Sequence, residues 1–475
     1  MKHMTFVRSI RRLAPARPPH GARTTVRLAA ALALGALSGC ALYHPLPLPT
    51  HDDLASALPT AGKAQAPTTK AAPQPAPLDM DEVATLAVLN NPDLNAARAS
   101  LGVAEAQAFA AGILPNPQLS LSSDRPIDRV NSPSDPRYPE YHQYGIGLAV
   151  DLRALLTHHS QYEAASAQLR QAREDLLWQE WQTVAEARLL YTAQVLGRER
   201  SASLAPAAKT FATAAARSQT ALAEGNLARD QADADQAAAV SIATQAGAAE
   251  RAAAQAERAL RALLGLRDSV QVPLAPLAAP PIPDRASVEA ALRSLPARRP
   301  DLRALQAGYR SQEEQVRTAV LSQFPNIVLG FNRSRDFSDV HSLGGAVSFD
   351  LPLFDRGQGA IAIQRATRAQ LRAEYQARLD QASAEVWQIW HEMRELKGEL
   401  AALDARLPGL GRTLADAKTA YRAGNYPVAA YLALVNAYLG AESSHYDLLQ
   451  NLWSDSIALA TLTGTQIEPA AVHAT

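Results

Sequence analysis

The residues that could carry chemistry are few and lie far apart in the chain. Cys40 is the only cysteine, so no intramolecular disulfide framework can form. His158-His159 is an adjacent histidine pair, and His391-Glu392 begins a zinc-protease motif that lacks its second histidine. Neither a P-loop pattern nor a G-x-S-x-G elbow occurs. From the sequence we therefore predict that the protein is not an enzyme and that it has no catalytic residues, metal site or cofactor.

The sequence before Cys40 indicates what its thiol does. Six arginines precede an apolar run, Leu28 to Leu37, and no acidic residue occurs in this stretch. The run is too short to span a bilayer but has the length of a signal-peptide core. Leu37-Ser38-Gly39-Cys40 resembles a bacterial lipoprotein signal, in which the cysteine thiol receives a lipid such as palmitate. We therefore predict a signal peptide over residues 1–39, a covalent lipid anchor on Cys40 and, because Ala41 follows it, sorting to the outer membrane.

Composition and charge restrict the possible partners. Residues 41–78 contain eight prolines among alanine, threonine and glutamine, so residues 40–78 are predicted to be a lipidated, semi-extended linker. Removal of residues 1–39 takes away seven basic residues and leaves 39 basic against 46 acidic ones. A net charge of −7 argues against a nucleic-acid partner.

The rest of the chain contains a tandem duplication. Asn91-Pro92-Asp93-Leu94 recurs as Arg299-Pro300-Asp301-Leu302. Three further motif pairs share one offset of 199 residues: Asp151-Leu152 with Asp350-Leu351, Gly225-Asn226 with Gly424-Asn425, and Gly265 with Gly464. Two copies of one structural unit are therefore expected. We place the first repeat at 79–270, a linker at 271–284, the second repeat at 285–466 and a tail at 467–475.

Each repeat is predicted to contain a pair of β-strands. Large apolar residues alternate with small or polar ones in four segments: Leu119 and Leu121; Tyr144, Ile146, Leu148 and Val150; Ile327, Leu329 and Phe331; and Leu343, Val347 and Phe349. The segment 125–141 is rich in proline and charge and is predicted to be an exposed loop. A half-buried soluble sheet would show the same alternation in any one strand. Two such pairs fit strands with lipid on one face and water on the other better.

Long helices are predicted after each strand pair. In the second repeat Leu379, Val386, Met393 and Leu400 are spaced by seven, which predicts a supercoiled helix seam, although a plain coiled coil has this pattern too. Gly-Asn pairs at 225–226 and 424–425 predict helix ends, after which helical sequence resumes. Pro206 and Pro408 fall inside the long helices and predict a kink or break at each.

With these features the chain resembles the TolC-like outer-membrane efflux protein family over residues 79–466. The run Asp350-Leu351-Pro352-Leu353-Phe354-Asp355-Arg356-Gly357 is most similar to the heavy-metal branch, the CzcC-like channels. The resemblance implies an α+β membrane protein: a homotrimeric twelve-stranded outer-membrane β-barrel, with four strands from each chain, continuous with a long periplasmic α-helical barrel. Four strands alone cannot close a barrel, and open edges are not tolerated in lipid. Residues 79–113 and 285–322, with parts near 203–220 and 405–420, would form a belt around the middle of the helical barrel.

The resemblance also implies a function and partners. A member of this family is a passive duct that joins a periplasmic adaptor protein and an inner-membrane pump of the resistance-nodulation-division type. Gly225, Asn226, Gly424 and Asn425 match the helix tips where the family meets those partners, although turn geometry alone also explains these residues. The predicted location is the outer membrane, with a lipid anchor and a long periplasmic extension.

The region after the first tip contains a candidate gate. Family channels often have acidic rings inside the second tip, but this chain has no acid there. Asp230 and Asp233 instead follow Gly225, so three copies would form a negative ring that favours cations. A solvated helix face is the alternative interpretation.

The sequence leaves the cargo open. Metal cations are favoured by the CzcC-like run alone, and drug or solvent efflux and type I protein secretion are the alternatives. A lipid-anchored coiled-coil protein without a pore is the alternative from a different functional class. The amphipathic strands favour the duct.

Overall fold

A computed structural model of the protein describes residues 43–58, 76–124, 142–337, 339–423 and 425–464. The chain divides into two units, Met1–Asp53 and Leu54–Thr475. In the first unit the described residues, 43–53, contain no helix or strand. Several predicted features lie outside the described residues: the signal peptide, Cys40, the loop 125–141, Gly424 and the tail 467–475.

The second unit contains a four-stranded antiparallel sheet. The strands are β1 (Gln118–Asp124), β2 (Gln143–Asp151), β3 (Ile327–Arg335) and β4 (His341–Phe349), and they pair in sequence order. β1 and β2 come from the first repeat and β3 and β4 from the second, so the repeats meet where β2 pairs with β3. The four predicted strands are thereby confirmed, each within a few residues of the predicted alternating segment.

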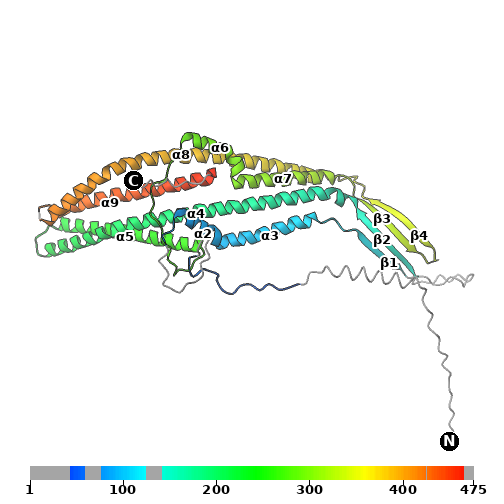
Figure 1. The fold of residues 1–475 in the computed structure, drawn as a ribbon, viewed down its shortest axis with the longest axis horizontal. Coiled ribbons are helices and arrows are strands. Elements are labelled where there is room, and N and C mark those ends of the chain that lie inside the picture. Colours follow the sequence, from blue (N-terminus) through cyan, green and yellow to red (C-terminus); the bar gives the residue numbers. More distant parts are fainter. Residues whose placement is uncertain (1–42, 59–75, 125–141, 338, 424, 465–475) are drawn as a thin grey trace, which may run out of the picture. The chain divides into compact units, whose positions relative to one another are not determined.

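Long helices extend from the sheet (Figure 1). The first repeat has α4 (Leu152–Ala223, 72 residues) and α5 (Arg229–Leu263), and the second has α8 (Gln358–Arg422, 65 residues) and α9 (Val428–Thr463). At about 1.5 Å per residue α4 is about 100 Å long. Among the described residues no helix is both long and apolar enough to cross a membrane.

Of the kink or break predicted at each internal proline, a break does not occur. Pro206 lies inside α4 and Pro408 inside α8, and both helices continue past them. Leu204 and Ala207, on either side of Pro206, are buried. The packing of this stretch therefore outweighs the one backbone hydrogen bond that the proline cannot donate.

Four shorter helices complete the repeats: α2 (Met80–Asn90) and α3 (Pro92–Gly112) in the first, and α6 (Arg285–Arg298) and α7 (Pro300–Leu321) in the second. Asp79 begins α2 with a capping box, and Asn91 and Asp284 cap α3 and α6 with their side chains. The predicted belt over 79–113 and 285–322 needs correction. α3 packs along α4, and α7 along α4 and α8, on the stretch that leads to the sheet (Figure 1), so both continue the helical wall.

The helices are arranged side by side in a fixed order. α4 packs against α3 and α5 on one side and against α7 and α9 on the other, and α8 packs on the far side of α7 and α9. The predicted seam in α8 is confirmed, since Val386, Met393 and Leu400 are buried against α9 and α6. A second apolar cluster joins α4 and α5 to α8 and α9 near the tips, around Phe211, Ile242 and Val435.

Part of the predicted linker is attached to the folded body. Ala55 N donates to Gly265 O at 2.9 Å, and Arg267 N donates to Ala55 O at 3.0 Å. Leu78 pairs in the same parallel manner with Leu274. Residues 55 and 78 therefore lie beside the segment that joins the repeats.

Candidate functional site

The sheet has one apolar face that is open to its surroundings. Eleven large apolar side chains of this face are exposed: Leu119, Leu121, Tyr144, Ile146, Leu148, Ile327, Leu329, Phe331, Leu343, Val347 and Phe349. The register places them in rows across the strands, for example Leu119 opposite Leu148 and Leu148 opposite Phe331. Contiguous exposed apolar surface of this kind marks a lipid or protein contact. Strands with alternating apolar and polar residues are typical of barrels in outer membranes.

The other face of the sheet is small and polar. A Cβ atom added to Gly147 would lie 2.5 Å from Ser120 Oγ, and one added to Gly145 would lie 2.6 Å from Ser122 Oγ. The hydroxyls of Ser334 and Ser342 lie 2.7 Å apart. Glycine thus makes room for a row of hydroxyl groups on this face, which suits contact with water.

The two outer strands leave the sheet incomplete. β1 pairs only with β2 and β4 only with β3 in the described chain, so each has one edge of unpaired backbone groups. Open edges of this kind bind further strands. Within a bilayer they must be paired, because no water is available to satisfy their N–H and C=O groups.

The first helix tip has the geometry of a Schellman cap. Gly225 has φ +74°, Gly225 N donates to Leu222 O at 3.0 Å, and Asn226 N donates to Ala221 O at 2.7 Å. The Asn226 side chain donates to Glu224 Oε2 at 3.2 Å and is exposed. Turn geometry thus explains the residue types here, and the exposed tip is also free to contact a partner.

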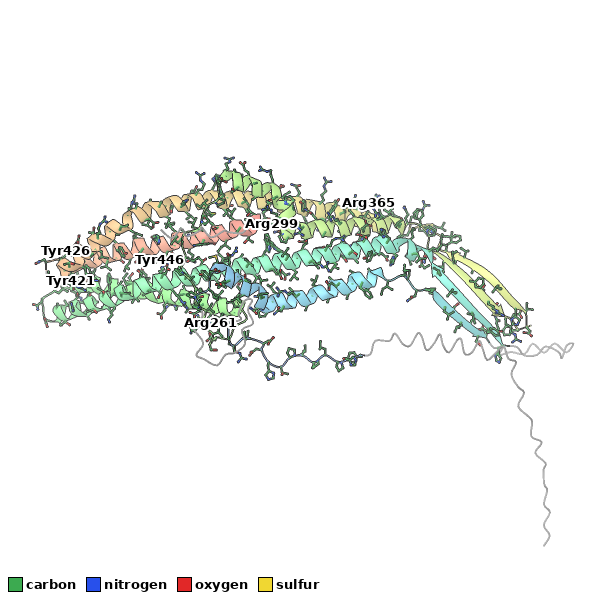
Figure 2. All side chains as sticks on the ribbon, viewed as in Figure 1. Arg261, Arg299, Arg365, Tyr421, Tyr426 and Tyr446 are labelled. Atoms are coloured by element: carbon green, nitrogen blue, oxygen red, sulfur yellow. The ribbon has the colours of Figure 1, made fainter. Side chains whose placement is uncertain are left out.

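The second tip shows the same backbone closure in its described part. Asn425 N donates to Ala420 O at 2.9 Å, the counterpart of the bond from Asn226, and Asn425 is exposed. Gly424 lies outside the described residues. This tip carries aromatic residues: Tyr421 and Tyr431 stack with ring centroids 4.8 Å apart, and Tyr426 follows the turn (Figure 2).

The acids after the first tip do not act as one group. Asp230 and Asp233 are exposed in the first turns of α5, and Asp233 Oδ2 lies 3.7 Å from Arg229 Nε. Asp235 is buried, and its carboxylate accepts a hydrogen bond from the hydroxyl of Ser218 in α4. Only the two predicted gate residues are therefore available to solvent.

A groove between the two helical hairpins was not predicted. It has a volume of about 350 Å³ and lies between α4 and the tip of the second hairpin, lined by Pro206, Lys209, Thr210, Thr213, Ala214, Arg217, Tyr421, Tyr431 and Leu432. Lys209, Thr213 and Arg217 follow at intervals of four, so they share one face of α4. The spacing of these three residues is visible in the sequence. The groove also needs Tyr421 and Tyr431, which come from about 200 residues further along the chain.

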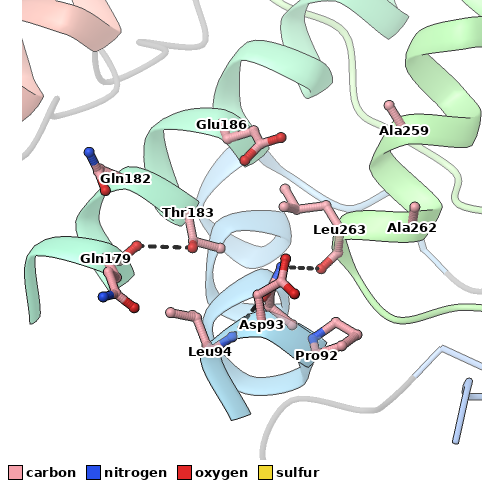
Figure 3. Close-up of a pocket in the computed structure, with 11 residues that line it drawn as sticks. Pro92, Asp93, Leu94, Gln179, Gln182, Thr183, Glu186, Ala259, Ala262 and Leu263 are labelled. Carbon is pink, nitrogen blue, oxygen red and sulfur yellow. Dashed lines mark hydrogen bonds between the residues drawn. The ribbon is translucent and has the colours of Figure 1, made fainter. Parts of the chain in front are cut away.

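A larger pocket lies where α5 ends and α3 begins (Figure 3). Its volume is about 550 Å³, and it is lined by residues of α3, α4 and α5 that include Asp93, Gln182, Thr183 and Glu186. Asn91 closes this junction: its Oδ1 accepts from Leu94 N at 2.9 Å and its Nδ2 donates to Leu263 O at 3.1 Å.

The same junction in the second repeat, where α9 ends and α7 begins, is filled. Arg299 is 3% exposed, its guanidinium pairs with Asp301 at 2.7 Å, and it stacks 5.1 Å from the Trp178 ring. A Cβ atom on Gly464 would lie 2.8 Å from Trp181 Cη2. Two tryptophans of α4 therefore pack on this junction.

The histidines do not gather into a metal site in the part of the chain that the structure describes. His158 is half-buried and His159 exposed near the start of α4. No group of three or more His, Cys, Asp or Glu side chains there is placed to hold a metal ion. His391 is exposed and packs its ring edge-on against Trp390.

Comparisons with known proteins agree with this architecture. Residues 291–465 match the family model of the outer membrane efflux protein. No curated protein sequence matches the chain significantly. A membrane protein from Pseudomonas aeruginosa is 21% identical, with a TM-score of 0.68 over 83% of this chain and 92% of that one.

Two further solved structures share the fold. The CmeC outer membrane channel of Campylobacter jejuni is 17% identical, with a TM-score of 0.66 over 81% of this chain and 85% of that one. The outer membrane protein VceC of Vibrio cholerae is 17% identical, with a TM-score of 0.65 over 82% of this chain and 97% of that one. At these identities the likeness establishes a common fold. The similarity to the outer membrane efflux protein family model covers residues 291–465, in the second repeat.

Proposed function

We propose that three copies of this chain form a passive channel through the outer membrane. The observation that carries the proposal is the exposed apolar face of an open four-stranded sheet that continues directly into long helices. Three copies of four strands give twelve, an even number that can close into a barrel. Closure places the apolar face toward lipid and the glycine- and serine-rich face toward a water-filled pore.

The helical layers support the same closure. In one chain α3 and α5 form one lateral side and α8 the other. Both sides carry exposed apolar residues, among them Val103 and Phe109 on α3 and Ile363 on α8. Packing α8 of one copy against α3 and α5 of the next would cover these residues, while β4 pairs with β1. Head-to-tail contacts of this kind close into a ring when the rotation fits.

The duct would work with partners that supply energy. The duct itself would conduct cargo passively. An inner-membrane resistance-nodulation-division pump, joined to it through a periplasmic adaptor, would supply the energy. The exposed tip residues Asn226 and Asn425 and the groove beside them form the docking surface in this proposal. Lys209 and Arg217 in that groove favour an adaptor helix with carboxylates. The lipid on Cys40 would anchor each chain to the outer membrane.

Asp230 and Asp233 form the candidate periplasmic gate in this proposal. Three copies would bring six exposed carboxylates to the mouth of the duct, which favours cations. Replacing both with alanine is expected to lower the cation-to-anion permeability ratio. An unchanged ratio would show that the two acids are a solvated helix face.

Metal cations are the favoured cargo, with drugs or solvents and secreted polypeptides as the alternatives. The preference rests on the similarity of residues 350–357 to the CzcC-like branch. Deleting the gene in its host and testing zinc, cobalt, cadmium, copper and drug tolerance separates these classes. Loss of metal tolerance supports the preference, whereas unchanged metal tolerance with new drug sensitivity reverses it.

Conductance in planar bilayers tests the channel itself. The full chain, purified from outer membranes, is expected to run as a trimer in native mass spectrometry and to conduct ions. A water-soluble monomer that conducts nothing would contradict the channel and support a coiled-coil structural protein.

A further inference from the structure

The apolar face of the sheet ends in a basic row at its hairpin end. From the helices outward, one row contains Val150, Leu329 and Val347, and the next contains Leu148 and Phe331. The following row runs from Ile146 through Arg333 to Leu343. The last row runs from Tyr144 through Arg335 to His341. This face thus changes from apolar to cationic within two rows of the β3–β4 turn, at the end of the sheet away from the helices (Figure 1).

Arg335 is held in place by its neighbours. Its guanidinium lies 6.0 Å from the centre of the Tyr144 ring, and its Nε lies 2.5 Å from Asp339 Oδ1. His341 Nε2 lies 3.7 Å from the same carboxylate oxygen. Asp339 therefore offsets one positive charge of this row and orients the arginine along the tyrosine ring.

Arg333 lies among apolar side chains and, among the described residues, has no carboxylate paired with its charge. It is exposed, and its partners across the two neighbouring strands are the exposed aliphatic residues Ile146 and Leu343. No ion pair of Arg333 exists among the described residues. A guanidinium at this level of a lipid-facing surface is costly unless it reaches the headgroup layer and finds an anion there. β3 is an interior strand, so pairing between copies at β1 and β4 leaves Arg333 facing the lipid.

We propose that Arg333, with Arg335 and Tyr144 beside it, binds a phosphate group of the phosphoglycolipid in the outer leaflet. This inference rests on the proposed function, which places the hairpin turns at the cell surface and the helices in the periplasm. The planar guanidinium of arginine pairs with phosphate through two parallel hydrogen bonds. Tyr144 supplies the amphipathic ring that belongs at a membrane interface. The chemistry selects a phosphorylated headgroup, and the outer-leaflet position selects the glycolipid over phospholipid.

Lipid titration of the detergent-solubilised trimer tests this site. Native mass spectrometry would count bound lipid while bisphosphorylated lipid A, its phosphate-free form and phosphatidylglycerol are added separately. Wild-type protein is expected to bind bisphosphorylated lipid A about tenfold more tightly than the phosphate-free form, the value of one charged hydrogen-bonded pair. Arg333→Gln should bring this ratio close to one, and Arg333→Lys should retain part of it. Arg310→Gln, at an exposed arginine of α7, is the matched control and should leave the ratio unchanged.

Each result has a definite meaning. A ratio in Arg333→Gln equal to that of wild type would overturn the site, and so would equally tight binding of phosphatidylglycerol. If Arg333→Gln does not assemble, Arg333→Lys is compared with wild type instead. An unchanged preference of Arg333→Lys for bisphosphorylated over phosphate-free lipid A would contradict bidentate pairing. A wild-type chain that forms no trimer would overturn the proposed function and the lipid site together, whereas a conducting trimer with no phosphate preference overturns the lipid site alone.

Discussion

The two helix junctions of this protein occupy equivalent places in the repeats but are built differently. Where α5 meets α3, Asn91 caps the helix with its amide side chain, and a pocket of about 550 Å³ remains beside Asp93 and Glu186. Where α9 meets α7, Arg299 and two tryptophans fill the corresponding space. One helix, α4, contributes to both: its polar face lines the first junction, and Trp178 and Trp181 pack on the second. The second junction is therefore one of the places where the two repeats pack together, and it lies within one chain.

The largest effect is expected from the pair at the start of α7. Arg299→Ala removes the partner of Asp301, which is 12% exposed, and leaves an unpaired carboxylate in the packed junction. We expect a loss of about 3 kcal/mol, the lower range for breaking a buried pair. Asn91→Ala removes only a neutral cap and should cost about 1 kcal/mol. Thermal midpoints from circular dichroism compare the two variants, and equal shifts would remove the distinction between the junctions.

A tryptophan deletion should sharpen the same contrast. Trp181→Ala takes away the ring that packs on Gly464, and we expect a cost of about 2 kcal/mol, because the ring is only half-buried. Gln182→Ala, at the adjacent position, alters only the wall of the open pocket and should stay within about 0.5 kcal/mol of wild type. A larger effect for Gln182 than for Trp181 would contradict this difference between the two junctions.

Asp455 in α9 and Glu257 in α5 should make the stability of the protein depend on pH in opposite directions. Burial raises the pKa of Asp455 in α9 to about 6, and Glu392 adds to the shift. Its ionisation therefore opposes folding, and this contribution to stability is lost as the pH rises from about 4 to 6. Partial burial also disfavours the charge on Glu257 in α5, but hydrogen bonds from Arg261 and Arg198 outweigh it and lower the pKa below 4.5. That contribution is present above pH 4.5 and is lost on acidification.

Two conservative variants measure this difference. Asp455→Asn should raise the thermal midpoint at pH 7. It should also flatten the dependence of the thermal midpoint on pH between pH 4 and 6. Glu257→Gln should lower the midpoint at pH 7 and remove the loss of stability on acidification below pH 4.5. A lower midpoint for Asp455→Asn at pH 7 would mean that an ion pair stabilises this carboxylate.

Features that depend on local sequence could be predicted closely. The alternation of Leu119 with Leu121 and of Ile327 with Leu329 gave the strands and their apolar face, because a strand places alternate residues on opposite sides. Gly225 marked the first tip, because its φ of +74° is open to few other residues. Each of these signals lies within a few residues of the structure that it specifies.

Features that depend on distant contacts could not be predicted. The stacking of Arg299 on Trp178 joins residues 121 positions apart, and the groove at Lys209 needs Tyr431 from the other repeat. Pro206 does not break α4, because burial on both sides of it outweighs one lost hydrogen bond. The belt was placed over too many residues because the sequence of α3 does not show that it packs along α4. The lipid on Cys40 and the gate at Asp230 and Asp233 stay predictions.

Cross-linking between β1 and β4 would show whether three chains close one barrel. Cysteines placed on the polar face, Ser122→Cys in β1 combined in turn with Ser342→Cys, Ala346→Cys or Ser348→Cys in β4, would be oxidised in outer membranes. The parent chain and each single variant serve as controls. We predict that at least one combination gives covalent dimers and trimers and no larger species. A ladder beyond three subunits, or no cross-link from any combination in conducting membranes, would contradict the closed trimeric barrel.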